Sequence, residues 1–370
     1  MTQTIRFGIV GCGSIVTRAH LPALQRIAGA KVTAVCDINK ERAEAAAQQC
    51  GAKAYTDFEA VASHPEVDAV LIATPNAYHR DPVLAAARAR KAVLCEKPIA
   101  TNLADAKEMV AACERARVPL QIGFHQRFNP PVQLARRLLQ LGVLGEVKAF
   151  RGVMSEPYHV YPAVTNYRYD LKVSGGNIVI DLAIHGIDVL RHLLGDVRAL
   201  CATVRHSAVP AKVDDNACLL MDLASSATGS MSADRFSPGG ASAFDLYGTK
   251  GTLYLSTHTY NPFQSAPIAV LTTLPFEQWP QELQEHFYSQ AWWLTPRDTW
   301  VTAHPVRQDP YQQQLQAFCK SITHGEPVQV TGEDGIRALE IVLAAYKSAK
   351  EQAWVKLPLT EDVVEPPKFS

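Results

Sequence analysis

The first third of the chain alternates apolar runs with segments of helical character, and this alternation constrains the fold more than any other feature. Apolar runs rich in Val and Ile lie at 4–11, 31–37, 68–75, 91–98 and 119–125, and the segments between them read as helices at 14–28, 39–50, 77–90 and 103–117. Continuous apolar runs joined by helices are typical of a parallel sheet that is covered on both faces. We therefore expect residues 1–125 to form an α/β domain around such a sheet.

A glycine-rich turn, GCGSIV, joins the first apolar run to the first helical segment. In a dinucleotide site Gly11 makes the tight turn, and Gly13 lets a pyrophosphate approach the backbone. The helix that starts at Ser14 and Ile15 then points its N-terminus at the phosphates. The turn predicts that residues 1–125 are a Rossmann dinucleotide-binding domain.

An acidic residue at the end of the second apolar run supports this prediction. Asp37 lies 24 residues beyond Gly13. A carboxylate there hydrogen-bonds a ribose hydroxyl and repels a ribose phosphate, which favours NAD over NADP. Lys40 and Arg42 follow closely and keep NADP as the alternative. Val16 departs from the pattern, since Gly or Ala is usual at that position.

The spacing of apolar residues along the chain changes after residue 125. Longer strands are expected at 147–153, 197–205, 216–223 and 227–235, and the last alternates small apolar residues with Thr, Ser and Asp. This alternation indicates a mostly antiparallel sheet with one packed and one open face. Residues 126–370 should form an α+β domain for substrate binding and oligomerisation, and we expect the closing helix at 333–350 to pack back near the first domain. The irregular stretch 259–305 is expected to be a lid or an interface segment.

Composition narrows the class of partner. A length of 370 residues favours two domains, and 36 basic residues balance 36 acidic ones. This balance argues against nucleic acid or an anionic membrane as a partner, and favours a small molecule. We expect no membrane helix, because no apolar stretch approaches the roughly 18 residues that such a helix needs. Eight scattered cysteines without metal-ligand spacing, and a start without a signal peptide, indicate a reducing, cytoplasmic compartment and no metal site.

The segment ATPNAYH, at 73–79, ends the run at 68–75. Ligands of open parallel sheets bind beyond the carboxyl ends of the strands, so Thr74, Pro75, Asn76 and His79 are candidates for cofactor contacts. The alternative is a Pro-Asn turn with a capping asparagine.

The next strand ends in VLCEKPIA, where Glu96 and Lys97 interrupt an apolar run. At the carboxyl edge, the compact charge of Lys97 could hold a substrate hydroxyl and stabilise a developing alkoxide. The alternative is a surface lysine at a strand end. Pro98 fixes the backbone after Lys97, and a cis peptide bond would aim the lysine.

A second candidate constellation lies in GGNIVIDLAIHGID, at 175–188. On a helix Asp181, His185 and Asp188 share one face, because they recur at i, i+4 and i+7. An acid beside an imidazole suits proton exchange, with His185 as the base and Asp181 orienting it. The alternatives are a surface Asp–His pair and, less favoured, a metal site that would also use His192.

Together these motifs resemble the Gfo/Idh/MocA oxidoreductases, the relatives of glucose–fructose oxidoreductase and inositol dehydrogenase. The resemblance rests on GCGSI, Asp37, TPNAYH, EKP and GGNIVIDLAIHGID, with GTKGTL at 248–253 and the closing helix. It implies a Rossmann domain followed by an α/β domain with a large, mostly antiparallel sheet. It also implies that Lys97, Asp181 and His185 form the catalytic set.

The resemblance places further residues near the site. Arg127 and Asn129 come from RFNP, and Tyr167 and Arg168 stand where the family has a Trp-Arg pair. Asn177 replaces the usual third glycine. Substrate contacts are expected from Lys97, Asp181, His185 and the aromatic residues Tyr158, Tyr161, Tyr167, Trp279, Trp292, Trp293 and Trp300, for which packing in a lid or interface is the alternative.

These observations predict an NAD(P)-dependent oxidoreductase that moves a hydride between nicotinamide and a secondary alcohol of a sugar, cyclitol or sugar derivative. One alternative is an enzyme that cleaves glycosides by transient oxidation and elimination while recycling NAD. Another is a non-catalytic NAD-bound sensor. The open sheet face predicts a homodimer or homotetramer.

Overall fold

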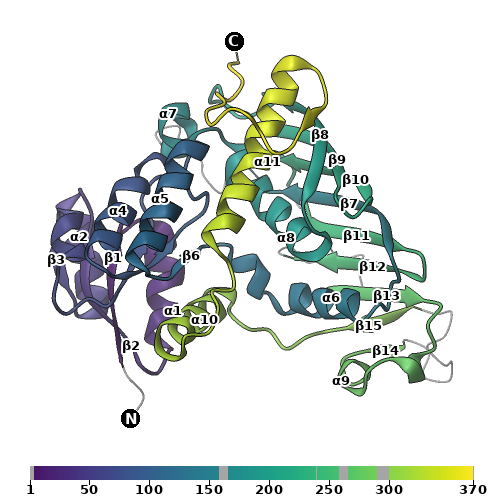
Figure 1. Ribbon diagram of the computed structural model, residues 1–370, viewed down its shortest axis with the longest axis horizontal. Coiled ribbons are helices and arrows are strands. Elements are labelled where there is room, and N and C mark those ends of the chain that lie inside the picture. The colour runs from purple at the N-terminus through teal and green to yellow at the C-terminus, as the bar shows by residue number, and fades with distance from the viewer. Residues whose placement is uncertain (1–3, 158–165, 239, 258–265, 290–299, 370) are drawn as a thin grey trace. The chain divides into compact units, whose positions relative to one another are not determined.

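The structure is a computed structural model, and it describes residues 4–157, 166–238, 240–257, 266–289 and 300–369. The chain divides into two compact units. The first unit consists of Met1–His125, Asp170–Gly175 and Asp309–Leu339, and the second of Gln126–Tyr169, Gly176–Gln308 and Glu340–Ser370. Each unit has its own sheet (Figure 1).

The first unit is built on a six-stranded parallel sheet in the order β3-β2-β1-β4-β5-β6. The strands are β1 (Ile5–Val10), β2 (Ala30–Cys36), β3 (Lys53–Tyr55), β4 (Ala69–Ile72), β5 (Ala92–Cys95) and β6 (Leu120–Ile122). All residues of β4 and β5 are buried, as the continuous apolar runs predicted. The expected parallel Rossmann sheet is confirmed, and its strand order reverses between β1 and β4.

Helices cover both faces of this sheet. They are η1 (Val16–His20), α1 (Leu21–Gln25), α2 (Lys40–Cys50), α3 (Phe58–Ala62), η2 (Asn76–Tyr78), α4 (Arg80–Arg88), α5 (Leu103–Ala116), α7 (Leu171–Ser174) and α10 (Pro310–His324). The helix expected at 14–28 opens with a π-helical segment, η1, before α1. Asn102 caps α5 by accepting a hydrogen bond from the Asp105 amide at 2.8 Å.

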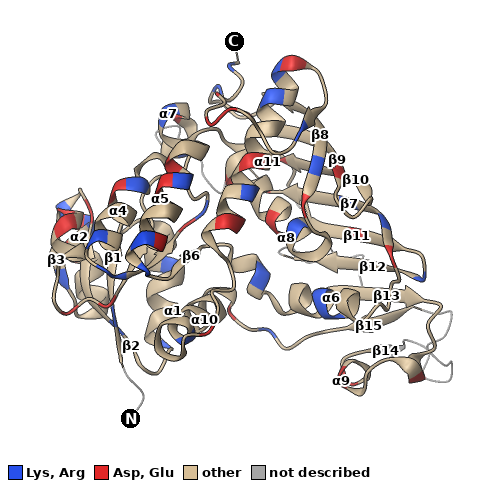
Figure 2. Ribbon diagram, in the orientation of Figure 1, with Lys and Arg blue, Asp and Glu red and all other residues tan. Residues whose placement is uncertain are grey.

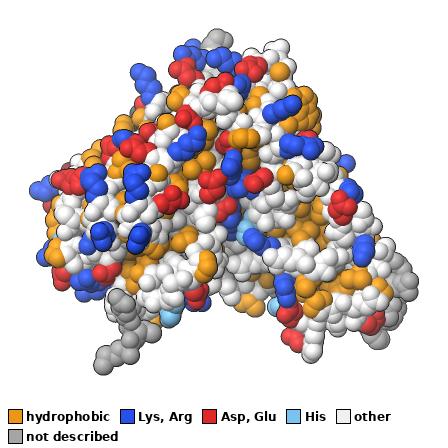
Figure 3. All heavy atoms as spheres, viewed as in Figure 1, with side chains coloured by type: hydrophobic (Ala, Val, Ile, Leu, Met, Phe, Trp, Pro, Cys, Tyr) orange, Lys and Arg blue, Asp and Glu red, His pale blue; other side chains and the backbone are white. Residues whose placement is uncertain are grey.

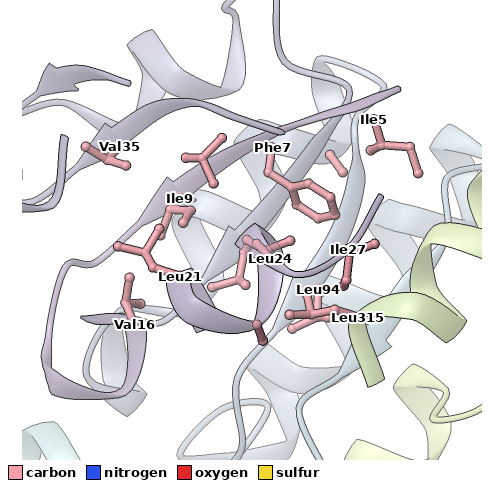
Figure 4. Close-up of a cluster of buried hydrophobic side chains, with 14 of the residues drawn as sticks. Ile5, Phe7, Ile9, Val16, Leu21, Leu24, Ile27, Val35, Leu94 and Leu315 are labelled. Carbon is pink, nitrogen blue, oxygen red and sulfur yellow. The ribbon is translucent and has the colours of Figure 1, made fainter. Parts of the chain in front are cut away.

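An apolar core fills the space between the sheet and α1, α2 and α10 (Figure 4). Phe7 and Ile9 of β1 point to this side, and Leu315 of α10 reaches the same cluster. The Phe7 ring also packs against Phe318, with ring centroids 6.4 Å apart. A helix from the last quarter of the sequence therefore completes the core of the first unit.

The second unit holds a ten-stranded sheet in the order β14-β15-β13-β12-β11-β7-β10-β9-β8-β16. The strands are β7 (Val147–Ser155), β8 (Val197–Arg205), β9 (Asn216–Leu223), β10 (Thr228–Asp234), β11 (Ser242–Gly248), β12 (Gly251–Ser256), β13 (Ile268–Thr272), β14 (Tyr288–Ser289), β15 (Val301–Ala303) and β16 (Val355–Lys356). Among these described strands β7 and β10 pair in parallel and the other pairs are antiparallel. The expected large, mostly antiparallel sheet is confirmed.

Helices pack against one face of the large sheet (Figure 1). They include α6 (Pro130–Gln140), η6 (Ile178–Ala183) and α8 (Ile184–Leu194), and shorter turns lie at η3 (His125–Phe128), η5 (Tyr167–Tyr169), η7 (Phe276–Gln278) and α9 (Gln281–Gln284). Along β9 the side chains alternate, and Leu220 on the other face is 50% exposed. The closing helix, α11 (Gly332–Glu351), contributes residues to both units. Oligomerisation through the open face stays a prediction.

Two expectations were wrong. The stretch 259–305 is not one irregular segment, because its described part supplies β13, α9, β14 and β15. One stretch, Leu171–Leu194, is also long and apolar enough to span a membrane, with a mean hydropathy of 1.4. However, 89% of an apolar 18-residue window within this stretch is buried inside the protein, as is usual for a core helix.

Charged residues of both signs lie along the helices and strands of both units (Figure 2). On the face seen in Figure 3, Lys and Arg atoms are intermixed with Asp and Glu atoms. This surface matches the equal numbers of basic and acidic residues in the sequence.

Candidate functional site

The glycine turn after β1 has the geometry of a dinucleotide loop. Gly11 has φ of +93°, and a Cβ there would lie 2.6 Å from the Ala73 carbonyl oxygen, so another side chain would be both strained and obstructed. A Cβ on Gly13 would meet no atom of the described residues within 4 Å. Open space therefore adjoins the backbone at the position where a pyrophosphate is expected to approach.

The helix after this turn starts as expected. The backbone carbonyl of Gly13 accepts hydrogen bonds from the amides of Val16 and Thr17, at 3.1 and 3.2 Å. Ser14 and Ile15 form the first helical residues. The sequence carries no capping side chain at this N-terminus, which suits an anion as the partner of the first amides.

Asp37, directly after β2, is joined to the glycine turn. Its Oδ2 accepts a hydrogen bond from the Cys12 amide at 2.8 Å, and its Oδ1 accepts one from the Asn39 amide at 2.9 Å. The carboxylate is thus fixed beside the loop while the side chain stays partly exposed. The glycine turn, the helix start and this acid together fit a dinucleotide, with the acid facing a ribose.

The segment after β4 is more buried than the sequence indicated. Asn76 is 4% exposed and donates from Nδ2 to the carbonyl oxygen of Ser174 at 2.7 Å. His79 is fully buried, and its Nε2 and Nδ1 lie 2.8 Å from the Thr74 carbonyl and 2.9 Å from the Pro98 carbonyl. Burial lowers the pKa of His79, although both carbonyls oppose the shift. These contacts tie the loop after β4 to the turn after β5, and cofactor contacts by this segment stay a prediction.

Glu96 and Lys97 follow β5 at the same carboxyl edge of the sheet. The Lys97–Pro98 bond is cis, as the sequence analysis proposed. The Glu96 carboxylate accepts hydrogen bonds from His20 Nε2 at 2.8 Å and from the Lys97 amide at 3.1 Å. Burial alone would raise the pKa of Glu96, but the hydrogen bond from His20 and the charges of His20, Lys97 and His125 hold that pKa below its ordinary value.

In the second unit Asp181 lies in η6 among ionic partners. Its Oδ2 accepts hydrogen bonds from Arg168 Nε and Arg235 Nη2, each at 2.9 Å. Arg235 is fully buried, and its Nη1 lies 3.1 Å from Glu156 Oε2. We call Glu156, Arg168, Asp181 and Arg235 the Asp181 cluster. Two guanidinium groups stabilise the negative charge of Asp181.

The other residues of this motif lie in α8. His185 is buried, with 7% of its surface exposed. Asp188 forms a two-point ion pair with Arg127, whose Nε and Nη2 lie 2.8 and 2.6 Å from the carboxylate oxygens. Both side chains of this pair are buried, so Asp188 fastens α8 to the segment before α6.

The aromatic candidates divide into three groups. The Tyr167 ring lies under the Arg168 guanidinium, 4.8 Å from its carbon. Trp279 is buried against Phe276 and Phe287, and Trp300 stacks on Tyr254 with centroids 4.9 Å apart, so both have packing contacts. Four candidates, Tyr158, Tyr161, Trp292 and Trp293, lie outside the described residues.

Sequence reasoning missed His20, Glu156 and Arg235. Arg235 carried a signal, because it falls on the buried side of the alternation that includes Met231 and Ala233. An arginine on that side needs a buried acid as its partner. Within the described part of the chain, no group of three or more His, Cys, Asp or Glu side chains could hold a metal ion.

A Rossmann sheet with a dinucleotide loop, followed by a second unit with a large antiparallel sheet, defines a two-domain NAD(P)-dependent oxidoreductase. Residues 5–124 match the oxidoreductase family with an NAD-binding Rossmann fold, and residues 136–357 match the C-terminal α/β domain of the same family. The chain belongs to this family, Gfo/Idh/MocA, as its motifs indicated.

Two curated relatives extend over nearly the whole chain. Myo-inositol 2-dehydrogenase of Thermotoga maritima is 29% identical over 95% of this chain and 98% of its own length. D-apiose dehydrogenase of Paraburkholderia graminis is 33% identical over 95% of this chain and 90% of its own length. Among solved structures, levoglucosan dehydrogenase in complex with NADH and levoglucosan shares the fold, with a TM-score of 0.82, 24% identity, and coverage of 96% of this chain and 100% of that chain.

Proposed function

We propose that this protein transfers a hydride between NAD(H) and a secondary alcohol of a sugar, cyclitol or sugar derivative. The names of the two curated relatives, an inositol dehydrogenase and an apiose dehydrogenase, support this substrate class. The observation that carries the proposal lies within the first unit. Lys97 follows β5 at the carboxyl edge of the sheet, where the glycine turn follows β1 and Asp37 follows β2.

The cofactor, when bound, supplies the acceptor for the hydride. Asp37 would hold a ribose hydroxyl, and its charge would oppose a ribose phosphate, so NAD is the proposed cofactor rather than NADP. Gly11, Gly13 and the start of the helix at Ser14 and Ile15 would hold the pyrophosphate. Secondary candidates for cofactor contacts are Thr74, Pro75, Asn76, His79, Glu96, Lys97, Arg127 and Arg168.

In the proposed chemistry two side chains act on the hydroxyl group of the substrate alcohol. As the C–H bond breaks, its hydrogen leaves with the electron pair as hydride, and His185 takes the hydroxyl proton as general base. Lys97 donates a hydrogen bond to the same oxygen and stabilises its developing negative charge. The products are a carbonyl compound, NADH and the protonated His185, and the reverse sequence reduces a ketone.

Asp181 has a different proposed part. Its charge is held by Arg168 and Arg235, so taking up a proton would weaken two charge-assisted hydrogen bonds. We assign Asp181 to positioning of substrate and of His185 rather than to proton transfer. Tyr167, which packs on Arg168, is a candidate for contact with the sugar ring.

Two lysines that flank β5 test the part of Lys97. Lys97→Met should lower kcat by about 100- to 1,000-fold, the usual loss for a group that stabilises an oxyanion. NADH affinity, measured by fluorescence titration, should change only a few-fold. Lys91→Met is the control, because Lys91 precedes β5 at the opposite edge and donates to the Val67 carbonyl at 2.6 Å. The assignment fails if Lys97→Met turns over as fast as the control while binding NADH normally.

A further inference from the structure

A buried hydrogen-bonded pair lies next to the proposed catalytic lysine. His20 is fully buried and Glu96 is 7% exposed, and His20 Nε2 lies 2.8 Å from Glu96 Oε1. Because an ionised carboxylate can only accept, the Nε2 nitrogen carries the proton of this hydrogen bond. The two residues come from different elements, His20 from η1 and Glu96 from the end of β5.

Aromatic packing fixes the orientation of the His20 ring. The ring meets Tyr311 edge-on, with centroids 5.2 Å apart and planes at 85°. The His125 ring also stacks on the Tyr311 ring, with centroids 4.2 Å apart and an angle of 17° between the ring planes. Gly123 leaves room for the carboxylate, since a Cβ there would lie 3.0 Å from Glu96 Oε1. The geometry at Glu96 is therefore set by several elements of the first unit.

The second oxygen of Glu96 reaches the backbone of Lys97. Glu96 Oε2 accepts a hydrogen bond from the Lys97 amide at 3.1 Å. A continuous set of contacts thus runs from the His20 ring through the Glu96 carboxylate to the backbone that carries the lysine. Rotation of the carboxylate would break both hydrogen bonds at once.

We propose that His20 is a positioning residue for the reaction, because it fixes the Glu96 carboxylate that holds the backbone and opposes the charge of Lys97. This inference rests on the part proposed for Lys97 and adds a residue that acts only through Glu96. It also links two functions of the first unit. His20 ends the helical segment that begins at the glycine turn, so the cofactor loop and the lysine share one internal support.

Charges around Glu96 determine the effect of removing His20. The groups that face Glu96 are His20, Lys97 and His125, with His79 and the Cys95 thiol nearby. Burial raises the pKa of Glu96, and the His20 contact is the largest opposing influence. Without His20 the pKa of Glu96 should rise, so the carboxyl group should take up a proton at a higher pH than in the wild type.

The first test follows turnover against pH. His20→Leu should lower kcat about 10- to 100-fold, the range expected when a charge-assisted hydrogen bond is lost, with a smaller change in the KM of the polyol. The acidic limb of the kcat profile should move to higher pH, because Glu96 protonates earlier. His20→Gln retains a donor and should recover most of the loss. Glu96→Gln should give the same low plateau without a shift of the acidic limb to higher pH, because the base proposed at His185 is still present.

The control separates positioning from lost stability. Ser348→Ala removes a buried hydroxyl that accepts from the Ala202 amide at 2.9 Å and donates to the Ala353 carbonyl at 2.6 Å, both in the second unit. This variant should lower the Tm while the pH profile keeps its shape. If His20→Leu lowers the Tm and leaves the acidic limb in place, His20 is a packing residue and the proposal is overturned.

The second test needs no substrate, so it stands even if the proposed reaction is wrong. Lysines are dimethylated with an isotope-labelled reagent, and the NMR signal of Lys97 is identified by its absence in Lys97→Met. In His20→Leu the chemical shift of this signal, followed against pH, should show an inflection from the protonation of Glu96. That inflection should be absent from the His20→Leu, Glu96→Gln double variant. A Lys97 signal that titrates alike in the single and the double variant overturns the proposal. Failure of turnover with every polyol, together with the expected titration, would instead count against the reaction alone.

Discussion

The glycine turn of the first unit and the Asp181 cluster of the second unit are built in opposite ways. The turn relies on backbone shape, and the Asp37 carboxylate joins it by accepting a hydrogen bond from the Cys12 amide, 25 residues away. The Asp181 cluster relies on charged side chains that join Asp181 to Arg235, 54 residues away. A site made of backbone tolerates many side chains but few changes of conformation, whereas a site made of buried charges tolerates little loss of a partner.

The largest effect is expected from the buried arginine. Arg235→Met removes a fully buried guanidinium between Asp181 and Glu156. Asp181 and Glu156 would each lose this cationic partner, and the free energy of unfolding should therefore fall by about 3–5 kcal/mol. Denaturant unfolding monitored by tryptophan fluorescence measures this loss.

Arg198→Met is the matched control in the same unit. Arg198 pairs with Asp222 at 2.7 Å, but its side chain is 59% exposed. An exposed pair contributes at most about 1 kcal/mol. Equal losses in the two variants would show that burial of charge does not distinguish the Asp181 cluster.

Smaller effects on stability are expected at the two glycines of the turn, and they should differ. Gly11→Ala places a side chain at φ of +93° against the Ala73 carbonyl, which should cost about 1–3 kcal/mol. Gly13→Ala meets open space and should leave stability unchanged within about 0.5 kcal/mol. Its added methyl group would instead obstruct the pyrophosphate, and NADH affinity should fall about tenfold or more, which corresponds to ~1.4 kcal/mol.

Thermal unfolding and NADH titration of the two glycine variants check both expectations. A Gly13→Ala protein that binds NADH as tightly as the wild type would contradict the placement of the cofactor at this turn. A stable Gly11→Ala protein would show that the turn relaxes more easily than its contact with Ala73 indicates.

The fold of the first unit could be predicted because its determinants are local. The first two apolar runs, the GCG turn and Asp37 lie within 40 residues of one another, and each is visible in the sequence. The mostly antiparallel sheet was predicted for the same reason, since alternation along 227–235 is a local pattern. Of the strands within 259–305, β14 and β15 were missed because they have only two and three residues.

The side-chain partners could not be predicted, because they depend on contacts between distant segments. The sequence suggested Asp181 and Asp188 as neighbours of His185 on one helix face. In the structure Asp188 pairs with Arg127, 61 residues away, and Asp181 pairs with Arg235, 54 residues away, as well as with Arg168, 13 residues away. In the first unit the pairing of His20 with Glu96 spans 76 residues. A charge on the buried side of a strand or helix was the one available signal, and it identifies a need for a partner without naming it.

The most direct test of the proposed function is a screen of neutral sugars and polyols with NAD, followed by the absorbance of the reduced nicotinamide ring. The account predicts that at least one polyol produces NADH, and that Lys97→Met abolishes most of this rate while NADH binding persists. Two results would contradict it. One is a protein that binds NADH but shows no reduction with any polyol and no oxidation with any keto-sugar. The other is consumption of a sugar substrate without any change in the nicotinamide absorbance.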